Sequence, residues 1–194
     1  MLGDGYHDLP PGKIASVVTH LQMYAPQVRG GILPDGLRFA ELPRDVATYR
    51  DLFRRVGQNW LWFGRLGLKD AELDAILSDP RVHLFTLLKE DKAEALLELD
   101  FREKGACELA YFGLTPALIG TGAGAFLMDE AQRRAFAPGV TRFHVHTCTL
   151  DSPQALGFYI RSGFVPYKRQ VEIADDPRQT GMLPAHVVPS LPVL

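Results

Sequence analysis

Three glycines stand close together after an apolar stretch, at Gly120, Gly122 and Gly124. The residues before them have strand character, and the residues after them repeat with helical spacing. A strand that runs through glycines into a helix exposes several backbone N–H groups at the positive end of the helix dipole. Glycine suits such a loop because a Cβ would block the close approach of phosphate oxygens and disfavour positive φ angles. The loop therefore predicts an anion site.

Two common nucleotide-binding patterns fit this loop poorly. A Walker loop needs a Lys followed by Ser or Thr, and none comes after Gly124. The dinucleotide fingerprint is formally satisfied by Gly120, Gly122 and Ala125, but it also requires an acidic residue about 20 positions further on. Residues 140–143 contain no acid. An NAD-binding protein thus stays open as a less favoured alternative.

A second pattern lies about 30 residues further on and runs from Ser152 to Phe164. Together the two patterns resemble the GNAT superfamily of acetyl-CoA-dependent N-acetyltransferases. The cofactor loop of that family begins with Gln or Arg, followed by two variable residues, a Gly, one variable residue, and a Gly or Ala. The downstream signature contains Asn, Ala, Tyr, Gly and Phe in that order. The matching positions are Gly122, Gly124, Ala155, Tyr159, Gly163 and Phe164, whereas Ile119 replaces Gln or Arg and Ser152 replaces Asn.

The resemblance covers about residues 82–171 and implies an acetyltransferase that uses acetyl-CoA as cosubstrate and needs no metal. Ser152 remains a good helix N-cap ahead of Pro153. Gly113 is expected to mark a bulge that frees backbone groups of its strand. The residues that we expect to bind acetyl-CoA are Phe112, Leu114, Gly120, Thr121, Gly122, Ala123, Gly124, Ser152 and Ala155.

Acyl transfer from a thioester to an amine also needs a base and an acid. A lysine-like amine has a pKa of about 10.4, so a base must take its proton, and the departing thiolate must gain one. The histone-acetylating branch of the family carries its base at the position of Glu108, and the family geometry makes Tyr159 the acid. An ordinary strand-end glutamate is an equally weighted interpretation of Glu108. Tyr159 could instead be a core aromatic, although its companion motif residues favour the catalytic role.

His144, His146 and Cys148 alternate along one strand and share a face. The histidines could act as bases or metal ligands, but without a third ligand we favour ordinary sheet histidines. Cys148 could carry an acyl group, yet no activating partner is visible, and a structural thiol is favoured.

The acceptor side of the cleft is formed in the family by the early helices and their loop. Here Trp60 and Trp62 could wall an acceptor pocket, with core packing as the alternative for at least one of them. We expect a small-molecule or peptide amine as the acceptor. A GNAT-like regulatory module that binds CoA without turnover is the competing function, because Ile119 and Ser152 depart from the family pattern.

The elements that must position these residues follow from periodicity and turn signals. Strands are expected at 13–23, 37–42, 82–88, 95–102, 106–114, 141–149 and 164–173, and helices at 43–57, 69–77, 123–137 and 153–161. The first two strands are expected to form a hairpin-like element. The fold class is therefore α/β of the α+β type, a GNAT fold with a mixed, mostly antiparallel sheet of about six to seven strands and about four helices.

Length and composition point to one domain. The chain of 194 residues suits a single domain over 1–176, with N-terminal strands in 1–42, a cofactor-binding core in 82–173 and an extended, Pro-containing tail over 177–194. Its 21 basic and 23 acidic residues are interspersed, which argues against nucleic-acid binding. Two cysteines and the absence of a secretory signal favour a cytoplasmic protein. We expect no membrane partner and leave room for a homodimer.

Overall fold

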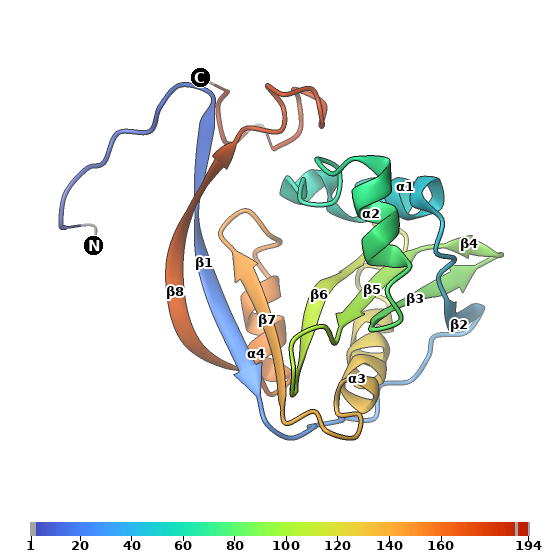
Figure 1. Cartoon of the computed structure of the whole chain (residues 1–194). Coiled ribbons are helices and arrows are strands. Elements are labelled where there is room, and N and C mark those ends of the chain that lie inside the picture. Colours follow the sequence, from blue (N-terminus) through green and yellow to red (C-terminus); the bar gives the residue numbers. More distant parts are fainter. Residues whose placement is uncertain (1–2, 189, 194) are drawn as a thin grey trace.

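A computed structural model describes residues 3–188 and 190–193 (Figure 1). Four α-helices, one 3₁₀ helix and eight strands make up this part of the chain. In chain order they are β1 (Lys13–Met23), β2 (Leu37–Glu41), α1 (Val46–Gly57), η1 (Gln58–Trp60), α2 (Asp70–Leu77), β3 (Val82–Lys89), β4 (Lys92–Ala93), β5 (Ala95–Asp100), β6 (Ala106–Leu114), α3 (Ala123–Ala135), β7 (Arg142–Cys148), α4 (Ala155–Arg161) and β8 (Val165–Asp175).

One mixed sheet forms the centre of the fold, with the strand order β2-β3-β5-β6-β7-β1-β8, and the two-residue β4 pairs with β3. Among the described strands, only β6 and β7 pair in parallel, and every other ladder is antiparallel. The expected mixed, mostly antiparallel sheet is confirmed. The expected hairpin of β1 and β2 is wrong, because β1 lies between β7 and β8 whereas β2 pairs with β3 at the opposite edge.

The segment that joins β1 to β2 crosses the molecule along α3. The buried carboxylate of Asp129 accepts hydrogen bonds from the backbone nitrogens of Arg29 and Gly31 at 3.0 and 2.6 Å. The backbone is so close here that a Cβ at Gly31 would lie 2.6 Å from the nitrogen of Phe126. The segment pairs with no described strand, so these contacts supply hydrogen-bond partners for its backbone. They hold it across the molecule between β1 and β2, which lie far apart in the sheet.

Helices cover both faces of the sheet (Figure 1). The α1 helix begins after Asp45, whose carboxylate accepts a hydrogen bond from Thr48 N at 2.7 Å, and it buries one apolar stripe with α2 against β3 and β5. The α3 and α4 helices pack on the other face, against side chains of β1, β5, β6 and β7. The sheet is thereby fixed from both sides, and its strand ends are held in place for the site.

The segment after β8 folds into successive turns, which differs from the extended tail that we expected. Leu183 and Val187 are buried and pack with Ile14 and Leu61. Arg178 donates to Asp176 Oδ2 at 2.7 Å and to three backbone carbonyls of the same segment. The segment therefore braces the loop that follows α1.

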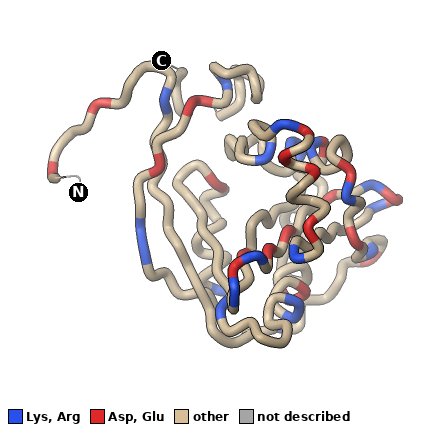
Figure 2. Tube along the Cα trace, in the orientation of Figure 1, with Lys and Arg blue, Asp and Glu red and all other residues tan. Residues whose placement is uncertain are grey.

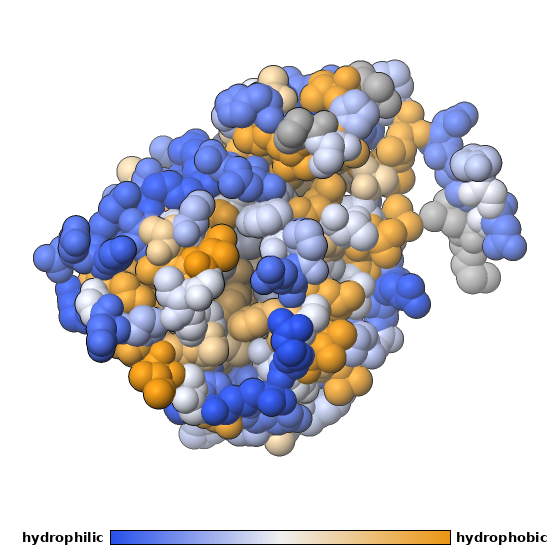
Figure 3. Space-filling view, turned by 180° about the vertical axis from the view of Figure 1, so that it is seen from behind, coloured by the Kyte–Doolittle hydropathy of each residue, from blue (hydrophilic) through white to orange (hydrophobic). Residues whose placement is uncertain are grey.

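The charged residues of both signs are interspersed along the trace (Figure 2). On the face shown in Figure 3, apolar and polar side chains are likewise intermixed. None of the described helices is both long and apolar enough to cross a bilayer.

Candidate functional site

The parallel strands β6 and β7 diverge and open a cleft. They pair only where Ala106–Glu108 face Arg142–His144, at the start of both strands. Beyond this vertex, β6 keeps its pairing with β5, and its other edge is free to bind an extended ligand through backbone groups. A cavity of about 470 Å³ occupies the opening and extends from the glycine loop to the loop after α1.

The glycine loop forms one wall of this cavity. Gly120 and Gly122 have φ angles of 81° and 89°, and Gly122 is the left-handed N-cap residue of α3. No acidic residue stands in the first turn of α3, so the helix dipole can attract an anion. The N–H groups of Ala123 and Ala125 donate to Thr121 and Gly122, whereas no described residue accepts from the N–H of Gly124. Gly124 lines the cavity as well, whereas Ala123 is buried in the core. Thr121 donates from its hydroxyl to the carbonyl of Leu118 at 2.8 Å and thereby closes the loop.

The second wall is β6, and both Phe112 and Leu114 line the cavity. The expected bulge at Gly113 is wrong: the register shifts where Glu98 faces Tyr111 and Leu99 faces Leu109, so Ala110 is the extra residue. Gly113 has a different role, since a Cβ there would overlap the side chain of Val56. Glycine at this position lets α1 pack tightly on β6.

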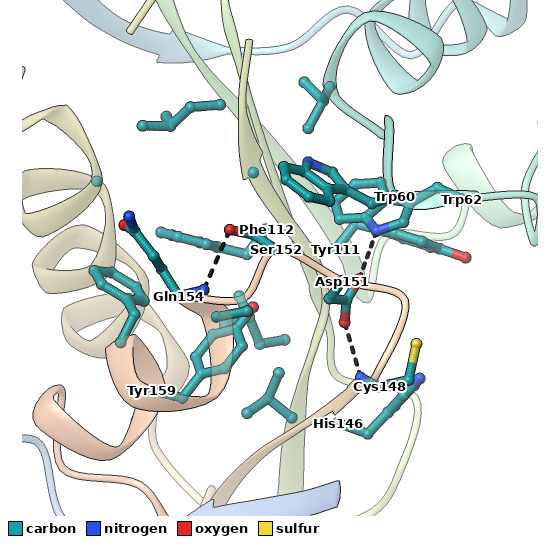
Figure 4. Close-up of a pocket in the computed structure, with 18 of the residues that line it drawn as sticks. Trp60, Trp62, Tyr111, Phe112, His146, Cys148, Asp151, Ser152, Gln154 and Tyr159 are labelled. Atoms are coloured by element: carbon teal, nitrogen blue, oxygen red, sulfur yellow. Dashed lines mark hydrogen bonds between the residues drawn. The ribbon is translucent and has the colours of Figure 1, made fainter. Parts of the chain in front are cut away.

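The third wall is the turn before α4 together with the helix itself, and Ser152, Ala155 and Tyr159 all line the cavity (Figure 4). The expected capping role of Ser152 is wrong in detail. The helix begins at Ala155 after Gln154, and the Ser152 hydroxyl accepts a long 3.4 Å hydrogen bond from Gln154 N. Ser152 therefore shapes the preceding turn.

The Tyr159 ring packs among Phe112, Phe158 and Phe164. No described residue is hydrogen-bonded to its hydroxyl. Burial, and then the charge of Asp151, raise the pKa of Tyr159, so the hydroxyl stays protonated at neutral pH. This is the state that a proton donor requires.

Glu108 does not line the cavity. It lies at the vertex, and its Oε1 is 3.5 Å from Nδ1 of His146, which does line the cavity. This contact lowers the pKa of Glu108 and raises the pKa of His146. His144 is turned to Glu103, with 3.2 Å between Nε2 and Oε2, and burial lowers its pKa. In the sequence, Glu108 is the candidate base and an ordinary sheet histidine is the favoured interpretation of His146, so their contact was missed.

Trp60 and Trp62 both line the cavity and lie side by side, above Asp151 in the view of Figure 4. Trp62 also packs against Phe53 and Tyr111, so it combines core packing with a wall position. Its Nε1 donates to Asp151 Oδ1 at 2.9 Å, and Asp151 Oδ2 accepts from Thr147 Oγ1 and Cys148 N. Sequence reasoning missed Asp151, because its partner Trp62 lies far away in the chain.

Cys148 lines the cavity too, and burial raises the pKa of its thiol. A thiol that resists ionisation is a poor nucleophile, which favours the structural interpretation. Within the described part of the chain, no group of three or more His, Cys, Asp and Glu side chains is placed to hold a metal ion.

A model of the acetyltransferase (GNAT) family matches residues 48–164. The comparison with curated proteins found no match. Solved structures share the fold. A GCN5-related N-acetyltransferase from Sphaerobacter thermophilus superposes with a TM-score of 0.59 at 16% identity, covering 83% of this chain and 52% of that one. A GCN5-related N-acetyltransferase from Kribbella flavida gives 0.53 at 17% identity, with 86% and 60% covered.

A functionally unknown conserved protein from Staphylococcus epidermidis ATCC 12228 gives a TM-score of 0.57 at 11% identity, with 85% of this chain and 63% of that one covered. This chain therefore spans only about half to two thirds of the length of these three structures. At such low identity, the likeness shows the common fold alone.

Proposed function

The chain belongs to the acetyltransferase (GNAT) family, and on this premise we propose that it transfers an acetyl group from acetyl-CoA to a primary amine. One observation carries the proposal. A single cavity is lined at once by the glycine loop, the free edge of β6, Tyr159 and the Trp60–Trp62 wall. Both reactants can therefore meet in one cleft, as direct transfer requires.

The cosubstrate fits the side of the cavity where β6 and the α3 N-terminus meet. Backbone N–H groups around Gly122 and Gly124 would hold the pyrophosphate, and the free edge of β6 at Phe112 and Leu114 would bind the pantetheine arm. Ile119 is 56% exposed and supplies no charge where the family has Gln or Arg. Binding then depends on backbone groups, which glycine leaves accessible.

The acceptor fits the opposite side. Trp60 and Trp62 provide apolar surface, and the carboxylates of Asp151 and Glu172 line the same cavity. An amine that is protonated in solution is attracted by such carboxylates before it loses its proton. We therefore expect a cationic primary amine with an apolar body as the acceptor, either a small molecule or a peptide.

CoA release against a panel of amines tests this function, with thermal shift by acetyl-CoA measured alongside. The panel contains alkylamines, arylalkylamines, amino acids and peptides, and apolar primary amines are expected to turn over best. Stabilisation by acetyl-CoA without turnover of any amine would favour the regulatory module that Ile119 suggests. If no acyl-CoA stabilises the protein, both functions are excluded.

Asp151 provides a test of the acceptor side. Replacing it by alanine removes the acceptor of the Trp62 Nε1 hydrogen bond, so the loop after α1 loosens. One such bond stabilises by about 0.5–1.5 kcal/mol, so the KM for the amine should rise roughly 2- to 10-fold while the KM for acetyl-CoA changes little. Steady-state kinetics with each substrate varied in turn measure both values.

The matched control is Asp175→Ala, which removes an exposed carboxylate paired with Lys13 at the end of β8. It should leave both KM values unchanged. An equal rise of both KM values in Asp151→Ala would show that the turn before α4 has collapsed as a whole, which would contradict the specific role of Asp151.

A further inference from the structure

Resting on the proposed function, we propose that His146 takes the proton from the acceptor amine and that Glu108 is a positioning residue that acts through it. The family resemblance made Glu108 the candidate base, with an ordinary strand-end glutamate equally weighted and the histidines left as possible bases. In the structure, however, His146 lines the cavity and Glu108 does not.

Glu108 lies where β6 and β7 are still paired, opposite His144 in the last residue pair of that ladder. It is therefore at the closed end of the cleft and does not line the cavity. His146 stands two residues further along β7, where the strands have separated, and it lines the cavity together with Tyr159 and Glu172. A bound amine would contact His146 and would have Glu108 behind it.

The contact between the two residues also selects the useful tautomer. Nδ1 of His146 is the nitrogen that lies 3.5 Å from Glu108 Oε1, so the carboxylate favours the proton on Nδ1. Nε2 then carries a lone pair and can accept a proton. No described residue is hydrogen-bonded to Nε2, which leaves this nitrogen to the acceptor.

The surroundings of His146 differ from those of the other histidines of the sheet. Contact with Glu108 raises the pKa of His146, burial opposes this, and the charges of Asp151 and Glu172 raise it further. His20 of β1 lies 5.7 Å away between ring centroids, and burial and His146 itself lower the pKa of His20. Of His20, His144 and His146, only His146 has its pKa raised above the ordinary value, because it contacts Glu108.

The proton and electron balance is simple. The ammonium group of the acceptor gives one proton to Nε2 of His146, and the freed nitrogen lone pair forms a bond to the thioester carbonyl carbon. The C–S bond breaks, its electron pair stays on sulfur, and the Tyr159 hydroxyl protonates the thiolate. The second proton of the nitrogen restores Tyr159. The net proton stays on His146, whose side chain is 51% exposed and can release it to water.

The pH dependence of kcat/KM tests the assignment with an amine that the wild-type protein acetylates. Because only neutral His146 accepts a proton, the wild-type rate should rise with pH through the pKa of His146. His146→Gln should lower kcat/KM roughly 100-fold and remove this limb of the profile. Glu108→Gln should cost less and move the limb to lower pH, because the carboxylate that raises the pKa of His146 is lost.

His144→Gln is the matched control on the same strand, since His144 does not line the cavity, and it should keep the wild-type profile. Acetyl-CoA binding and melting temperature are measured for each variant to confirm that it is folded. The assignment is overturned if His146→Gln keeps the wild-type profile, or if Glu108→Gln loses activity as completely as His146→Gln does. The test uses an amine that the wild-type protein already acetylates. A negative result would therefore exclude His146 as the base without contradicting the proposed acetyltransferase function.

Discussion

Tyr159→Phe should lower kcat by roughly 10²- to 10⁴-fold while acetyl-CoA binds almost as before. The substitution removes one hydroxyl oxygen and keeps the ring that packs among Phe112, Phe158 and Phe164. No described residue is hydrogen-bonded to that oxygen, so its loss leaves no partner unsatisfied and should cost little stability. The substitution should therefore slow only the step in which the departing thiolate is protonated. Steady-state kinetics give kcat, and calorimetric titration gives the Kd of acetyl-CoA.

Tyr167→Phe is the matched control for this substitution. Tyr167 lies on the exposed strand β8, and its hydroxyl accepts a hydrogen bond from Arg142 at 2.9 Å, away from the cavity. It should keep wild-type kcat. If Tyr159→Phe also keeps wild-type kcat, Tyr159 has no part in proton transfer, and the thiolate must be protonated by water or by another group.

The elements of this fold could be predicted closely because their signals are local. The β1 strand has the expected ends, α1 ends at Gly57 as expected, and the glycine loop leads into α3. In each case the spacing of the apolar residues within the element predicts its type, and a nearby glycine or turn residue predicts where it ends. The same holds for Tyr159, whose place on α4 follows from a spacing of four after Ala155.

The partners of these elements could not be predicted, because they depend on contacts between distant residues. The position of β1 between β7 and β8 rests on a crossing segment held by Asp129, which in the sequence is only a polar residue of a helix. Likewise, alternation placed His144 and His146 on one face, but the residue at which β6 and β7 separate decides which of them reaches the cavity.

A buried charge network beneath the site has the largest expected effect on stability. The side chain of Glu98 on β5 is fully buried and accepts hydrogen bonds from Tyr49 of α1 and from Arg65 of the loop after it. Burial and then Glu98 raise the pKa of Tyr49 well above its ordinary value, so Tyr49 remains a donor. The guanidinium of Arg65 also lies 5.1 Å from the ring centre of Tyr111, which lines the cavity.

Glu98→Gln should therefore lower the free energy of unfolding by about 3–5 kcal/mol, because Arg65 keeps its charge in a buried place without a counterion. The amide also turns an N–H group toward one of the two donors. Urea unfolding followed by circular dichroism measures the change, and Asp91→Asn is the control. Asp91 pairs with Arg38 at an exposed turn, so its loss should cost about 0–1 kcal/mol. A similar small cost for Glu98→Gln would mean that the loop carrying Arg65 rearranges so that the guanidinium reaches water, which would contradict a structural role for the buried ion pair.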